Sequence, residues 1–91
     1  IATKNDSVVK RIKIGGKPKT IVLSKDGQYL FIANFGANRL DIMNTATDSI
    51  ITIPAGKNPC GLDLDPDEKR IYLTNWSSNN VMIFNLGRSE N

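Results

Sequence analysis

The chain repeats itself along most of its length. When the sequence is shifted by 41 positions against itself, identical residues coincide at many places. The coinciding pairs include Gly15 with Gly56, Pro18 with Pro59, Leu23 with Leu64, Asp26 with Asp67, Asn34 with Asn75, Asn38 with Asn79, Ile42 with Ile83 and Asn44 with Asn85. Repetition at a fixed spacing is typical of folds that stack one structural unit. The 91 residues therefore contain two copies of one unit.

Each copy has the pattern of several short strands. Apolar segments of strand length alternate with turn residues, and no helical periodicity is present. The predicted strands are Val8–Ile14, Thr20–Ser24, Tyr29–Asn34, Arg39–Asn44, Ser49–Pro54, Gly61–Asp65, Arg70–Asn75 and Asn80–Leu86. Four short strands in a repeat of about 40 residues are typical of one blade of a β-propeller.

Two of these strands resemble a known repeat. Tyr29–Asn34 (YLFIAN) and Arg70–Asn75 (RIYLTN) resemble the RVYVTN strand that names the YVTN repeat family. Gly15–Pro18 and Gly56–Pro59 are similar to that family's VGxxP motif, and Asn44–Thr47 is similar to its IDTAT turn. The sequence departs from the family pattern at Lys19, Cys60 and Asp63. The resemblance implies an all-β fold of the WD40/YVTN repeat-like kind, a β-propeller with two four-stranded antiparallel blades.

The resemblance also implies how the blades divide the chain. It places an outer strand at 8–14, a blade at 15–54 and an incomplete blade at 56–86, within one unit of residues 1–91. Two blades cannot close a ring, because propellers have about four blades or more. We expect the other blades to come from a longer polypeptide or from further copies of this chain, joined head to tail as a homo-oligomer. The chain opens on Ile1 without a signal peptide, which we interpret as a mature or trimmed product.

Charge is distributed unevenly along the chain. Up to Lys25, seven basic residues and one acidic residue give +6, and from Asp26 onward five basic and eight acidic residues give −3. Oppositely charged halves can attract one another within a chain, or each can attract the opposite half of a neighbouring copy. Basic residues that protect an edge strand from aggregation explain the same pattern equally well.

The family resemblance places two sets of loops at one end of the blades. We call this end the channel-mouth face; it comprises the loops that enter the innermost strands and those between the second and third strands. Its residues are Lys17, Lys19, Phe35, Arg39, Lys57, Asn58, Cys60 and Trp76. Cations and aromatic rings in one place favour an anionic or glycan ligand. Alternatively, Phe35 and Trp76 pack between blades, since they occupy equivalent repeat positions.

Two residues of the second copy are unusual. Asp63 lies between two leucines of a predicted inner strand, where the first copy has Val22, so its carboxylate is expected to bind a ligand or to accept a structural hydrogen bond. The acidic run that begins at Asp63 lacks the glycine and the glutamate spacing of a calcium loop. Cys60 is interpreted as a small packing residue, with a reactive thiolate as the alternative.

Asn75-Trp76-Ser77 and Asn5-Asp6-Ser7 have the sequence of glycosylation sites.

The composition excludes several kinds of chemistry within this chain. There is no histidine, which excludes a Ser-His-Asp triad and histidine ligation of zinc or haem. We predict no catalytic residue, metal, cofactor, nucleic-acid partner or membrane span. The resemblance implies a non-enzymatic binding or scaffold module of an exported protein, in the periplasm or the surface layer. Alternatives are a fragment of a propeller enzyme, similar to lactonase-like propellers or to quinoprotein amine dehydrogenase subunits, and a minimal propeller unit whose function is assembly.

Overall fold

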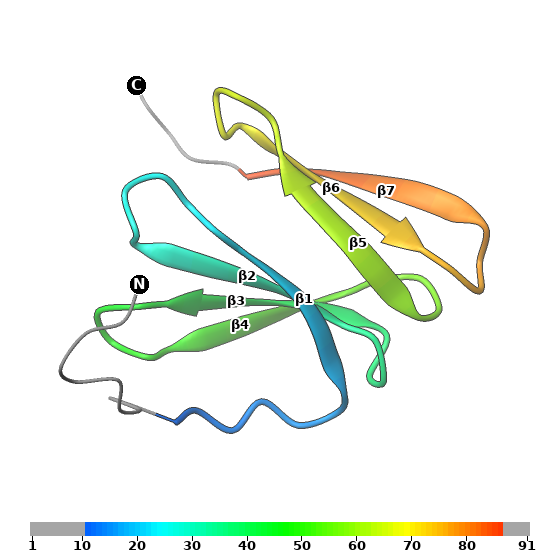
Figure 1. Cartoon of the computed structure of the whole chain (residues 1–91), viewed down its shortest axis with the longest axis horizontal. Helices are drawn as coiled ribbons and strands as arrows, with labels where there is room; N and C mark the ends of the chain where they lie inside the picture. Colours follow the sequence, from blue (N-terminus) through cyan, green and yellow to red (C-terminus); the bar gives the residue numbers. More distant parts are fainter. Residues whose placement is uncertain (1–10, 87–91) are drawn as a thin grey trace, which may run out of the picture.

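All secondary structure in the described residues, 11–86, is β-strand (Figure 1), as a computed structural model of the chain shows. The strands are β1 (Pro18–Leu23), β2 (Tyr29–Asn34), β3 (Arg39–Asn44), β4 (Ile50–Pro54), β5 (Pro59–Leu64), β6 (Arg70–Asn75) and β7 (Asn80–Asn85). They form a four-stranded sheet of order β1-β2-β3-β4, here called blade 1, and a three-stranded sheet of order β5-β6-β7, called blade 2. All pairings are antiparallel. The all-β prediction is therefore confirmed.

The described part of the chain has one strand fewer than two complete blades. The predicted strand Val8–Ile14 lies partly outside the described residues, and residues 11–14 form no strand. Blade 2 ends at β7, so residues 11–86 contain no fourth strand for it. Ile51 of β4 pairs with Ile42, and both side chains lie on the side of blade 1 that faces blade 2. Ile51 is nevertheless 62% exposed, because the described part of blade 2 has no fourth strand to cover it.

The turns recur at equivalent positions in the two blades. Asn38 in the β2–β3 turn has φ 58°, and Asn79 in the β6–β7 turn has φ 57°. Asn is among the few residues that adopt this left-handed conformation readily. Each blade therefore turns at an Asn, which explains why this residue coincides in the two copies.

The core lies between the blades. Side chains alternate between the two faces of a strand, and one face of blade 1 carries Phe31, Ala33 and Leu40. These residues form a cluster with Ile71 and Leu73 of blade 2, and all five are buried. β5 lies against β1 and β2, as Figure 1 also shows. We call this contact the blade junction.

Both faces that point away from the junction carry exposed apolar residues, although the β2 and β3 parts of the blade 1 face are largely buried. On blade 1, the leading face is the one that carries Ile21 (61% exposed) and Leu23 (55% exposed) of β1. On blade 2, the trailing face carries Val81 (56% exposed) and Ile83 (59% exposed). Asp63 and Thr74 lie on the trailing face as well, because Asp63 shares a row with Ile83 through Tyr72, and Thr74 pairs with Val81. Blade faces of this kind are normally covered by neighbouring blades.

Replacing Leu73 by Ala is expected to lower the free energy of unfolding by about 2–5 kcal/mol, because the substitution leaves a cavity in the blade junction. Leu23→Ala is the matched control and is expected to change stability by about 0.5 kcal/mol or less, since Leu23 is exposed. Urea unfolding followed by circular dichroism measures both. Equal losses for the two variants would contradict the described junction.

Candidate functional site

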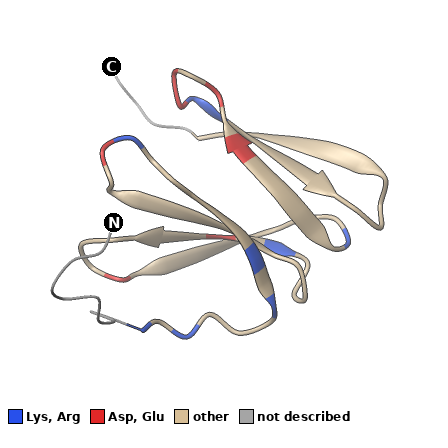
Figure 2. Ribbon diagram, in the orientation of Figure 1, with Lys and Arg blue, Asp and Glu red and all other residues tan. Residues whose placement is uncertain are grey.

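Two kinds of loop meet at one end of the blades. In blade 1, the N–H of Gly36 in the β2–β3 turn donates to the carbonyl of Lys17, which precedes β1, at 3.2 Å. In blade 2, the N–H of Trp76 in the β6–β7 turn donates to the carbonyl of Asn58, which precedes β5, at 3.0 Å. The loops of the predicted channel-mouth face therefore lie together. Figure 2 shows basic residues at this end and acidic residues mainly at the opposite turns.

A cation and two aromatic rings form a row across the blade junction. Lys19 Nζ lies 5.0 Å from the centroid of the Phe35 ring. The Phe35 ring stacks on the indole of Trp76, with centroids 6.2 Å apart and planes inclined by 28°. Phe35 belongs to blade 1 and Trp76 to blade 2, so this stack is a contact between blades. Trp76 is nevertheless 67% exposed and leaves most of its surface open to a ligand.

Small and polar side chains occupy the same end of the blades as this row. Cys60 occupies the repeat position of Lys19, and its carbonyl accepts a hydrogen bond of 2.5 Å from Thr20 Oγ1. Its Sγ lies 3.8 Å from Thr74 Oγ1. Asn58 Nδ2 donates to the carbonyl of Phe35 at 3.3 Å, and Ser77 Oγ donates to Asn58 Oδ1. Cys60 thus lies on β5 where this strand contacts β1 of the other blade.

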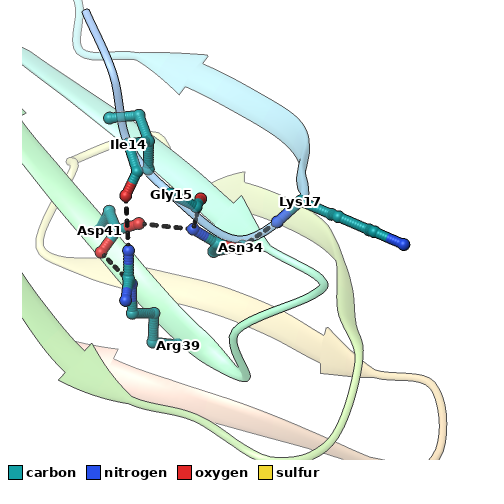
Figure 3. A network of polar contacts seen from close by, with 6 residues as sticks. All are labelled: Ile14, Gly15, Lys17, Asn34, Arg39 and Asp41. Atoms are coloured by element: carbon teal, nitrogen blue, oxygen red, sulfur yellow. Dashed lines mark hydrogen bonds and ion pairs between the residues drawn. The ribbon is translucent and has the colours of Figure 1, made fainter.

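The two lysines of the loops before β1 and β5 are held by their backbones. The N–H of Lys17 donates to Asn34 Oδ1 at 3.0 Å, and the N–H of Lys57 donates to Ser78 Oγ at 2.8 Å. Both residues are exposed. In Figure 3 the Lys17 side chain extends away from the polar network behind it. A fixed backbone with an exposed ammonium group suits the attraction of anions.

Arg39 takes part in a buried network that the sequence analysis missed. Its Nε donates to Asp41 Oδ1 at 2.9 Å, and its Nη2 donates to the carbonyl of Ile14 at 2.7 Å. Asn34 Nδ2 donates to Asp41 Oδ2 and to the carbonyl of Gly15, both at 3.0 Å. Asp41 is 0% exposed. The network in Figure 3 holds the segment before β1 against blade 1.

Blade 2 has a simpler arrangement at the equivalent positions. Asn80 and Met82 replace Arg39 and Asp41. Asn75 Oδ1 accepts from the N–H of Gly56 at 3.1 Å, and its Nδ2 donates to Asn80 Oδ1 at 2.9 Å. Asn75 is buried, so the glycosylation sequence at Asn75-Trp76-Ser77 is inaccessible in the folded chain. The other such sequence lies outside the described residues.

The structure separates Asp63 from the row of Lys19, Phe35 and Trp76. Asp63 lies near the end of β5, next to the turn that leads to β6. Lys19 lies at the start of β1, and the two rings follow β2 and β6, at the opposite end of the blades. Asp63 Oδ1 accepts a hydrogen bond of 2.9 Å from the N–H of Leu64. The side chain is exposed on the trailing face. Asp63 is therefore remote from the aromatic part of the predicted site.

The family model for lactonases, described as a 7-bladed β-propeller, matches residues 16–90. The chain belongs to this lactonase propeller family. Antigen Lp49 of Leptospira interrogans (serogroup Icterohaemorrhagiae, serovar copenhageni, strain Fiocruz L1-130) is 28% identical over 96 aligned positions, which cover 89% of this chain and 21% of the antigen.

Hydrazine synthase of Kuenenia stuttgartiensis contains a chain with a similar fold. Its TM-score is 0.73 at 21% sequence identity, over 92% of this chain and 24% of that one. At this identity the likeness shows the fold alone. The lactonase propeller chain thus spans between a fifth and a quarter of the length of these two proteins.

The described residues were also compared with the requirements of a metal site and of a membrane-spanning helix. Residues 11–86 bring together no group of three or more Cys, Asp or Glu side chains that could hold a metal ion. The same residues include no helix that is long and apolar enough to cross a membrane.

Replacing Arg39 by Met is expected to lower the free energy of unfolding by about 3–5 kcal/mol, because the buried Asp41 carboxylate then lacks its cation. The double variant Arg39→Asn/Asp41→Met copies the residues of blade 2 and is expected to recover most of this loss. Chemical denaturation of the three proteins provides the measurement. A loss below about 1 kcal/mol for Arg39→Met would show that the network is dispensable.

Proposed function

We propose that this chain is the ligand-binding part of a lactonase-type propeller and acts as a non-enzymatic binding or scaffold module. The observation that carries the proposal is the row formed by Lys19, Phe35 and Trp76. An exposed indole that is held by a second ring offers a rigid apolar plane at a small cost in conformational entropy. Such planes are suited to stacking against flat or weakly polar ring faces.

The charge around the row supports an anionic glycan as the ligand class. Lys17 and Lys57 are exposed at the same end of the blades, and Lys19 lies over Phe35. Asn58, whose carbonyl accepts from the N–H of Trp76, and Ser77, which follows Trp76, add an amide and a hydroxyl group to the same loops. A sugar ring can stack on Trp76 while its carboxylate or sulfate groups are attracted by the lysines. Neutral sugars can use only the first of these contacts.

We also propose an extracytoplasmic location, in the periplasm or at the cell surface. The proposal is supported by the similarity to a protein that is named an antigen. Protease treatment of intact source cells tests it. Digestion at the surface, or release with the periplasmic fraction, is expected, whereas recovery with cytoplasmic marker proteins would contradict it.

The second candidate function is lactone hydrolysis by a complete propeller. The match to the lactonase family favours it. The test is a lactone hydrolysis assay on this chain and on any longer polypeptide that contains it. Turnover above the uncatalysed rate would support the enzyme and contradict the non-enzymatic module.

Binding of an acidic oligosaccharide is expected to change the fluorescence of Trp76, which is the only tryptophan of the chain. Lys19→Ala is expected to weaken binding about two- to fivefold, which corresponds to about 0.5–1 kcal/mol for an exposed cation near an aromatic ring. Ile83→Ala on the trailing face is the control and should bind like the parent chain. A chain that shows no signal with acidic or neutral oligosaccharides up to millimolar concentration would contradict the proposed function.

A further inference from the structure

The polar contacts of the blade junction predict which contacts could form between two copies of the chain. In a head-to-tail pair, blade 2 of one copy would meet the leading face of blade 1 of the next. Each residue at that contact would then replace the residue 41 positions away in the observed junction. The chemistry of the contact between copies therefore follows from the sequence and from the observed junction.

One polar contact of the blade junction joins two turns. The N–H of Lys25 donates to Glu68 Oε2 at 2.8 Å, and Lys25 Nζ donates to the carbonyl of Pro66 at 2.9 Å. In the contact between copies, Pro66 would take the place of Lys25 and Gly27 that of Glu68. Proline has neither the N–H nor the ammonium group, and glycine has no carboxylate. Neither hydrogen bond can form.

A second contact is lost at the innermost strands. Thr20 Oγ1 donates to the carbonyl of Cys60 in the observed junction. Its counterpart in blade 2 is Gly61, which has no hydroxyl group. A Cβ atom at Gly61 would lie 2.5 Å from Thr74 Oγ1, so the packing within blade 2 requires glycine at this position.

The aromatic stack would also be obstructed. Between copies, Trp76 would take the role of Phe35 and would have to stack on the Phe35 ring of the next copy. Lys19 already lies 5.0 Å from the centroid of that ring. In the observed junction the same repeat position is the small Cys60. Lys19 therefore covers a ring that a second copy would need.

Asp63 adds a charge to a contact that is apolar in the observed junction. Its repeat counterpart is Val22 of β1. In a head-to-tail pair the Asp63 carboxylate would meet the leading face, whose exposed residues on β1 include Ile21 and Leu23. The N–H of Leu64 donates to one oxygen of this carboxylate, but burying the charge without a cation is still costly. The trailing face nevertheless has the apolar residues Val81 and Ile83 that a docking surface requires.

We infer that the trailing face docks a propeller blade of different sequence, whose innermost strand presents a cation or a hydrogen-bond donor to Asp63, and that it does not dock a second copy of this chain. The packing of blade 1 on blade 2 supplies the template for this contact. The apolar residues provide burial, and Asp63 selects the neighbour. This inference is independent of the ligand proposed above.

Light scattering and sedimentation of the 91-residue chain over a concentration series test the inference. The parent chain is expected to remain monomeric at micromolar concentrations. The triple variant Gly27→Glu/Asp63→Val/Pro66→Lys restores the chemistry of the observed junction, and it is expected to self-associate at least tenfold more tightly. Glu at position 27 is compatible with its φ of 74°, because Glu68 has φ 56° at the equivalent position.

Two further variants separate Asp63 from general effects. Ile21→Lys places a cation on the leading face and is also expected to increase self-association, by supplying a cation to the Asp63 carboxylate of the neighbouring copy. Asp67→Val removes one carboxylate from the exposed β5–β6 turn and is expected to leave the chain monomeric. A parent chain that forms a discrete species of three or four copies would overturn the inference. The same holds if Asp67→Val associates as tightly as the triple variant, or if neither the triple variant nor Ile21→Lys associates.

Discussion

The packing of blade 1 against blade 2 is the contact on which the rest of the structure depends. A sheet with one hydrophobic face must bury that face against another element. Phe31 and Leu40 of one sheet and Ile71 and Leu73 of the other provide that burial. Because each sheet uses only one face for the junction, the leading face keeps exposed apolar residues on β1, and the trailing face keeps them on β7. The two-blade chain thus has a buried core at its centre and exposed apolar residues on both outer faces.

The proposed ligand site also depends on this junction. Phe35 comes from blade 1 and Trp76 from blade 2, so neither blade has the stacked pair alone. The buried pair of Arg39 and Asp41 holds the segment before β1 on the other side of blade 1. Anything that loosens the junction is therefore expected to separate the rings before it disturbs the sheets themselves.

Much of the fold could be predicted from the repeat, and much of the site could not. The bounds of β2, β3 and β6 agree with the predicted strands, because alternating apolar residues and flanking turns fix them. The network of Asp41 was missed, although an Asp at the repeat position of Met82 was a visible signal. The strand alternation could have placed Asp63 on an outer face, but its distance from Trp76 depends on where along β5 it lies. Contacts such as Lys25 with Glu68 join different blades, and no local pattern reveals them.

The differences between the two copies carry information that the similarities do not. Ile21 and Leu23 correspond to Leu62 and Leu64, so the apolar parts of the two junction faces are interchangeable. If burial alone selected neighbours, any blade of this repeat could dock on any other. Several polar positions that differ between the copies lie at junction contacts, among them Lys25 against Pro66, Thr20 against Gly61 and Glu68 against Gly27. Burial therefore supplies the affinity of one blade for another, while hydrogen bonds and charges such as that of Asp63 determine which blade it is.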